Sequence, residues 1–234
     1  MKRLPVPFVI LMLVALLAAG PAAAGKDLPT LDQVLSRYVE VMGGAEAIGK
    51  LETRTITGRQ IDDRPYRGPA VTSSLKAFAD AAGDWTMSLD GPEGQWREGC
   101  AAGRPWVRQP GEDGSEGTHG NTKLGFLFNA QGPLQVARYF PNPRLTGTWT
   151  HDGVAYYQVE NDLAAEHYTL YFEVETGMLT RIGYHWRLED FRPVDGVLVP
   201  GKVVRGRKGG STDLIFDDVA HGAHVAPHLG PGGK

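Results

Sequence analysis

The chain has 234 residues, of which 41% are hydrophobic and 22% are charged, and its formal net charge is −3. This length and composition predict a globular protein of one large domain or two small ones and exclude a wholly disordered chain. The small negative charge, without a cluster of Lys and Arg, argues against a protein that binds nucleic acid through its phosphates. The single cysteine, Cys100, excludes a disulfide within the chain and a cysteine-rich zinc site.

The first 24 residues predict a secretory signal peptide. A positive start, Met1-Lys2-Arg3, precedes an apolar stretch from Phe8 to Ala19, and small residues then lead to Ala24. The apolar stretch is shorter than the roughly 20 residues that a membrane-spanning helix needs, so a retained anchor is the less favoured alternative. We therefore expect cleavage near Ala24, export to the periplasm and no transmembrane segment in the mature chain.

The start of the mature chain predicts two helices and then a strand. Thr30 can cap a helix, with Gln33 completing a capping box, and apolar residues recur at helical spacing until Gly43-Gly44. Residues 45–51 predict a short second helix. Residues 53–61 are rich in β-branched side chains, which favour a strand.

The rest of the chain predicts many strands. Apolar and polar side chains alternate in segments 85–89, 145–150, 168–174 and 181–188, which is typical of strands with one buried face and one exposed face. Turn formers separate the strands at intervals of about 10 residues. Four dipeptides suit turns that need positive φ and predict hairpins: Asp90-Gly91, Asp152-Gly153, Thr176-Gly177 and Asp195-Gly196.

Three segments depart from this alternation. Residues 110–122 are polar and rich in Gly, and they predict a mobile loop. The apolar run over 124–139 predicts short helices or irregular segments that lie against the sheet. Residues 221–234 are rich in Gly, Pro and His and predict a flexible tail, whose histidines suit only adventitious metal binding, so we predict no metal site.

A large sheet with one apolar face must bury that face. Helices that cover it incompletely would leave an apolar cavity for a hydrophobic ligand; the alternative is a fully packed fold in which every aromatic residue belongs to the core. Alternation along the strands gives the candidate lining residues Trp85, Met87, Trp96, Trp149, Tyr168, Leu170 and Phe172. The predicted first helix adds Leu35, Tyr38 and Met42. The candidate lid residues are Leu124, Phe126, Leu127 and Phe128.

Three blocks of sequence carry a family resemblance. Tyr38–Ile48 reads YVEVMGGAEAI and is soon followed by the strand Arg54–Gly58, Tyr171–Arg181 reads YFEVETGMLTR, and Asp190–Pro200 reads DFRPVDGVLVP. Together they resemble the exported lipoprotein-sorting carriers of the LolA/LolB-like superfamily. The resemblance covers about residues 31–61 and 168–219, and its motifs are structural rather than catalytic.

The resemblance implies a mainly β fold with α (α+β): a strongly curved antiparallel sheet that forms a half-barrel, covered by an N-terminal helix and short helical segments, as a single domain over 25–220. It also implies a periplasmic carrier or binding protein for lipoprotein acyl chains or other lipids, with envelope membrane proteins as donor or acceptor. The family has no acyl-binding motif that can be matched here, so the lining residues rest on alternation alone.

Two other functions stay open. The same sheet can serve an envelope regulator or sensor that holds a protein partner, or, less favoured, a small-molecule enzyme. The sequence contains no H-E-x-x-H zinc helix, no P-loop, no G-x-G-x-x-G and no G-x-S-x-G motif. We therefore predict a binding protein with no catalytic residues and no cofactor.

Overall fold

The computed structural model describes residues 28–64, 68–111, 115–116, 121–162, 168–207 and 209–222. The predicted signal peptide lies outside these residues, as do residues 223–234 of the predicted tail and most of the predicted polar loop. None of the described helices is long and apolar enough to cross a bilayer.

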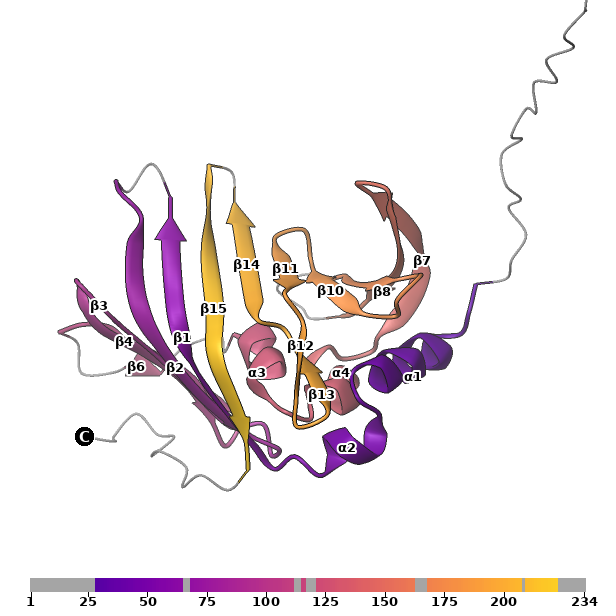
Figure 1. Cartoon of the computed structure of the whole chain (residues 1–234), viewed down its shortest axis with the longest axis horizontal. Helices are drawn as coiled ribbons and strands as arrows, with labels where there is room; N and C mark the ends of the chain where they lie inside the picture. The colour runs from indigo at the N-terminus through magenta and orange to yellow at the C-terminus, as the bar shows by residue number, and fades with distance from the viewer. Residues whose placement is uncertain are drawn as a thin grey trace, which may run out of the picture.

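In the part of the chain that the structure describes, thirteen strands form one open antiparallel sheet (Figure 1). Their order is β6-β5-β4-β3-β2-β1-β15-β14-β11-β10-β9-β8-β7, so the first and last strands of the chain pair near the middle of the sheet. The bounds are β1 Thr53–Asp63, β2 Val71–Asp80, β3 Trp85–Gly91, β4 Gly94–Ala101, β5 Arg104–Arg108, β6 Ser115–Glu116, β7 Arg144–His151, β8 Val154–Glu160, β9 Leu170–Glu173, β10 Leu179–Ile182, β11 Trp186–Glu189, β14 Lys202–Arg207 and β15 Gly210–His221. The predicted α+β class with a large antiparallel sheet is confirmed.

The sheet curves into two walls, with helical segments between them (Figure 1). Strands β1–β6 form the first wall and β7–β11 the second, and β15 and β14 join the two. The remaining elements are α1 Leu31–Val41, α2 Ala45–Gly49, α3 Thr122–Phe128, the 3-10 helix η2 Gly132–Gln135, α4 Val136–Tyr139, and a hairpin of β12 Arg192–Val194 and β13 Val197–Val199. We call the face of the sheet that the helices cover the inner face and the opposite one the outer face.

Helix α1 begins at the capping box that the sequence predicts. The Gln33 backbone N–H donates to Thr30 Oγ1 over 3.2 Å, and the Thr30 backbone N–H donates to Gln33 Oε1 over 2.8 Å. Its buried face holds Val34 and Tyr38. The Tyr38 ring meets the Phe172 ring of β9 edge to face, with centroids 5.2 Å apart, so α1 packs against the second wall.

The β12–β13 hairpin packs against the end of α1. The Leu198 backbone N–H donates to the Met42 carbonyl over 2.9 Å. Gly43 has φ +128°, and a Cβ there would lie 2.6 Å from the Gly196 carbonyl oxygen, so the close approach requires glycine. Asp195 and Gly196 have φ 51° and 79°, as predicted for this hairpin turn.

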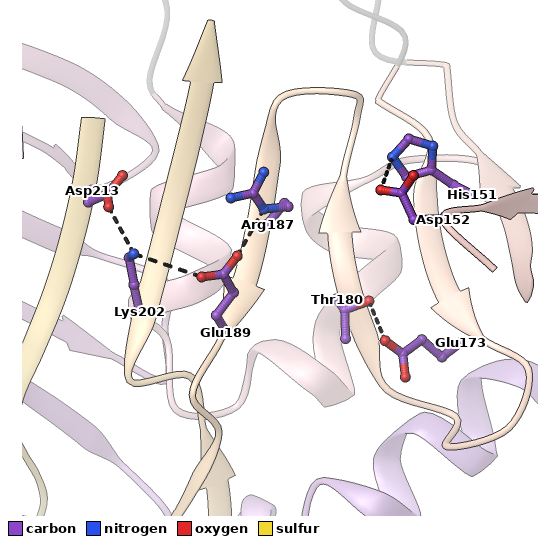
Figure 2. A network of polar contacts seen from close by, with 8 residues as sticks. All are labelled: His151, Asp152, Glu173, Thr180, Arg187, Glu189, Lys202 and Asp213. Atoms are coloured by element: carbon purple, nitrogen blue, oxygen red, sulfur yellow. Dashed lines mark hydrogen bonds and ion pairs between the residues drawn. The ribbon is translucent and has the colours of Figure 1, made fainter. Parts of the chain in front are cut away.

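The two faces of the sheet differ in chemistry. The inner face carries the apolar core, which includes Ile56, Leu75, Trp85, Met87, Leu170, Phe172, Leu188, Val203, Leu214 and Phe216. The outer face carries polar networks (Figure 2). There Lys202 Nζ lies 2.9 Å from Asp213 Oδ2 and 3.9 Å from Glu189 Oε2, which links β15, β14 and β11. Apolar side chains thus lie on the inner face and polar ones on the outer face, as in other sheets with one buried side.

A bulge in β7 corrects the predicted position of Trp149. The alternation puts Leu145 and Trp149 on one face, but the register shifts between Leu145 and Gly147. Leu145 therefore packs against the core, while the Trp149 ring lies on the outer face, 4.9 Å from the Tyr171 ring. An extra residue in a strand moves every later side chain to the opposite face.

Three further predictions are corrected. The segment 181–188 is two strands rather than one, because the chain turns at Gly183, where φ is +60°. The first predicted hairpin forms between β3 and β4, but its turn lies at Pro92-Glu93 and not at Asp90-Gly91. The residue with positive φ is Gly94, at 105°. Strand β15 extends to His221, which belongs to the sheet and not to the tail.

Candidate functional site

Helix α3 fills the space between the walls. All five residues from Leu124 to Phe128 are buried, because one side of this short helix packs on the inner face and the other on α4. Phe128 lies between Trp85 and Phe216, with ring centroids 5.8 Å and 6.2 Å away. The predicted lid residues therefore cover the inner face of the sheet.

The segment after α3 is anchored by side-chain amides. Asn129, which is 1% exposed, donates through Nδ2 to the Tyr139 hydroxyl over 2.9 Å. Gln131 Nε2 donates to the carbonyls of Gly49 and Leu51 over 3.1 Å and 3.0 Å. These bonds fix the segment after α3 to α4, to α2 and to the connection between α2 and β1. In contrast, the Asn121 side chain makes no capping hydrogen bond at the N-terminal end of α3.

A buried arginine ties α3 to the sheet. Arg54 of β1 shares the inner face with Ile56 and is 4% exposed. Its Nη1 donates to the Leu127 carbonyl of α3 over 3.0 Å, and its Nε donates to His221 Nε2 over 3.0 Å. Burial lowers the pKa of Arg54 to about 10, opposed by the nearby Tyr38 hydroxyl.

His221 continues this polar network to the β12–β13 hairpin. Because arginine only donates, His221 Nε2 must accept, and the proton of the neutral ring lies on Nδ1. Nδ1 is 3.1 Å from Asp195 Oδ2. Burial, and then the charge of Arg54, lower the pKa of His221, so the neutral ring is favoured. We call Arg54, His221, Asp195 and the Leu127 carbonyl the fastened end of the site.

The other end of the inner face is more polar. A cavity of about 50 Å³ lies there, lined by Gln60, Met87, Glu98, Asn121, Leu124, Trp186, Val203, Arg205, Thr212 and Leu214. Burial raises the pKa of Glu98 to about 7. We call the polar residues Gln60, Glu98, Asn121, Arg205 and Thr212 the open end of the site.

These cavities are too small for an acyl chain while α3 is in place. A second inner cavity, beside Arg54 and Tyr38, has about 20 Å³. A larger hollow of about 410 Å³ lies on the outer face of the first wall, but its lining mixes apolar groups with hydroxyls and charges, including Thr57, Lys76 and Arg97. Of the two inner cavities that the described residues line, neither can accept a long apolar ligand unless α3 moves.

The structure brings most of the predicted lining residues together on the inner side. Tyr38, Met42, Trp85, Met87, Leu170 and Phe172 are buried in one core cluster, and Leu35 and Tyr168 pack against it. Trp96 pairs with Leu89 on the inner face of β4 and is half-buried. Trp149 is the exception, since it lies on the outer face.

Sequence reasoning assigned none of the charged or titratable residues of this site to it: Arg54, Glu98, Asp195, Arg205 and His221. Arg54 alternates in phase with Ile56, and Glu98 alternates in phase with Trp96 and Cys100, so the period placed both on a buried face. His221 carried no such signal. Among the residues that the structure describes, no group of three His, Cys, Asp or Glu side chains could hold a metal ion.

Solved structures share this fold. A LolA superfamily protein from Nitrosomonas europaea matches with a TM-score of 0.55 at 14% identity, over 82% of this chain and 93% of that one. A DUF1329 family protein from Desulfovibrio piger has a TM-score of 0.57 at 12% identity, over 85% and 96%. An outer membrane lipoprotein-sorting protein domain from Vibrio parahaemolyticus has a TM-score of 0.52 at 10% identity, over 82% and 95%. No protein-family model and no curated protein matches the sequence. The chain therefore has the fold of LolA superfamily proteins.

Proposed function

We propose, from a fold shared with lipoprotein-sorting proteins, that this chain is a carrier or binding protein for lipoprotein acyl chains or other lipids. The observation that carries the proposal is the packing of α3, whose buried side chains occupy the inner face that a lipid would need. Apolar burial is non-directional, so an acyl chain can replace the Phe and Leu side chains of α3 on this surface at little cost in hydrophobic free energy.

The way in which α3 is held supports a lid that moves. Apolar packing fixes the side chains of α3. Among the described residues, Arg54 is the one charged side chain that donates a hydrogen bond to the α3 backbone. The N-terminal end of α3 has no side-chain cap and adjoins the open end of the site. Displacement of α3 from this end would join the small inner cavities into one apolar groove.

The location that fits this function is the periplasm. Residues 1–24 have the features of a signal peptide, and we propose that the mature protein starts near Gly25. Osmotic release of the periplasm and N-terminal sequencing of the released protein test this. A chain that keeps residues 1–24 and stays with the membrane would contradict it.

The first test is to identify what the protein carries. The mature protein is purified from an exporting host without detergent, and an organic extract is analysed beside the intact complex by mass spectrometry. A stoichiometric lipid is expected. Delipidated protein that also takes up no labelled fatty acid or lipopeptide would overturn the proposal and direct the search to a protein partner.

A further inference from the structure

Glu98 is a carboxyl group on the inner face of the sheet. Its strand neighbours across β3 and β5 are Met87 and Val107, both apolar. Among the described residues, no hydrogen-bond donor or cation is a partner of its side chain, and burial alone raises its pKa to about 7. A glutamine or methionine here would avoid the desolvation of a carboxylate, so packing does not explain this residue.

The surroundings of Glu98 are those of the polar end of a binding site. Gln60, Asn121 and Thr212 line the same cavity and offer neutral donors and acceptors. Leu124 of α3, Val203 and Leu214 line its apolar side. An acyl chain that took the place of α3 would therefore have its head group beside these polar residues.

The cations near this cavity come from β14 and from α3. Arg205 of β14 lines the cavity, and its guanidinium lies 5.9 Å from the Trp186 ring centroid. Lys123 of α3 lies over the same ring, with Nζ 5.1 Å from the centroid. Strand β1 presents the neutral Gln60. Among the described residues that line the cavity, Glu98 is the only carboxyl group.

We infer that Glu98 selects the head group of the ligand: its carboxylate accepts a hydrogen bond from an amine, amide or hydroxyl and disfavours a free carboxylate or phosphate. Arg205 supplies the complementary donor for an oxygen of the same head group. This inference rests on the proposed binding of acyl chains to the inner face. It makes Glu98 the residue that determines specificity at the open end of the site.

The test compares three ligands with one chain length: decylammonium, decanol and decanoate. Calorimetric titration of delipidated protein at pH 8.5, where Glu98 is ionised, is expected to rank them in that order. Because about a tenth of Glu98 is ionised at pH 6, the preference for decylammonium over decanoate should fall by about tenfold between pH 8.5 and pH 6. Glu98→Gln should show a preference that does not change with pH.

Glu93→Gln is the matched control, because it removes the same charge from the exposed β3–β4 turn of the same hairpin. It should keep the wild-type order and its pH dependence. Glu98→Gln that behaves as the wild type, or wild-type protein that binds all three ligands equally at pH 8.5, overturns the inference and leaves acyl binding intact. If no ligand with a decyl chain binds at either pH, the proposed function fails, and the inference fails with it.

Discussion

The two ends of the inner face bury charge in opposite ways. At the fastened end, the buried cation of Arg54 has a backbone carbonyl and a neutral imidazole as partners, and His221 passes the contact to Asp195. At the open end, Glu98 is half-buried beside a cavity and has no such partner among the described residues. The first arrangement stabilises one position of α3, whereas the second leaves a hydrogen-bonding capacity that a ligand can fill.

This difference assigns separate tasks to the two ends of α3. The C-terminal end is held by Arg54 and by the anchors at Asn129 and Gln131, and the N-terminal end has no side-chain cap. Under the proposed function, opening that starts at the open end would expose the cavity before the fastened end is broken. The following variants test whether the ends are separable, from the largest expected effect to the smallest.

Phe128→Asp should have the largest effect, because it places a carboxylate between Trp85 and Phe216 where Phe128 is fully buried. We expect a loss of stability on the order of 4 kcal/mol in chemical denaturation. Because α3 and an acyl chain compete for the same inner face, weaker docking of α3 should raise the uptake and retention of a labelled fatty acid, while circular dichroism still reports the sheet.

Leu134→Asp is the control for this variant. Leu134 is 40% exposed in η2, close to α3 in sequence, and it accepts a charge without burying it. Its lipid retention and stability should stay near those of the wild type. Unchanged retention in both Phe126→Asp and Phe128→Asp would refute the position of the lid.

Glu98→Gln should change how stability depends on pH. Burial raises the pKa of Glu98 from 4.5 to about 7, so the folded protein holds this proton more tightly than the unfolded chain. Stability in the wild type therefore falls as pH rises from about 4.5 to 7, by about 2–3 kcal/mol. Urea denaturation across this range should show the fall in the wild type and in Glu93→Gln, and not in Glu98→Gln.

Arg54→Met should loosen the fastened end. It removes the donor to the Leu127 carbonyl and leaves that carbonyl and His221 Nε2 without their partner, at a cost of about 1–3 kcal/mol. Relative to the wild type, backbone hydrogen exchange should accelerate more in α3 than in β15. Arg59→Met, on the outer face of the same strand, removes an exposed ion pair with Asp217 and should change stability by less than about 1 kcal/mol. If α3 exchanges hydrogen at the same rate in both variants, Arg54 does not hold α3 to the sheet.

The sequence was sufficient for the architecture, because local chemistry decides most of it. The capping box of Thr30 and Gln33 and the turn at Asp195-Gly196 each depend on a few neighbouring residues, and both appear as predicted. Alternation failed where one residue changed the phase, as at the bulge before Trp149. The alternation also hid the turn at Gly183. Ile182 and Trp186 pair directly across this turn and share a face, so the pattern continues from β10 into β11.

The polar part of the site was beyond sequence reasoning for a physical reason. In an alternating segment, a charged side chain is normally assigned to the solvent-exposed face. Which of the two faces is exposed depends on the strands that pair with the segment. Alternation puts Arg54 in phase with Ile56 and Glu98 in phase with Trp96, but only the pairing of β1 with β15 and of β4 with β3 identifies these faces as the inner face of one sheet. The His221–Asp195 contact joins residues 26 apart in the sequence, and no local pattern predicts it.

His221→Gln should have the smallest effect at neutral pH and the most selective one in acid. The folded state lowers the pKa of His221, so the unfolded chain binds this proton more tightly, and stability falls as pH drops below about 6.5. Protonation also removes the lone pair that accepts from Arg54 Nε and puts two cations side by side. Glutamine offers both an acceptor and a donor without titrating, so in this variant the hydrogen exchange of α3 should no longer accelerate between pH 7 and pH 5.

The pH dependence of stability from His221 is opposite in sign to that from Glu98, whose contribution to stability improves in acid. A double variant should lose both pH dependences. If acid accelerates exchange equally in wild type and His221→Gln, the fastened end does not respond to pH, and Arg54 alone holds α3 to the sheet.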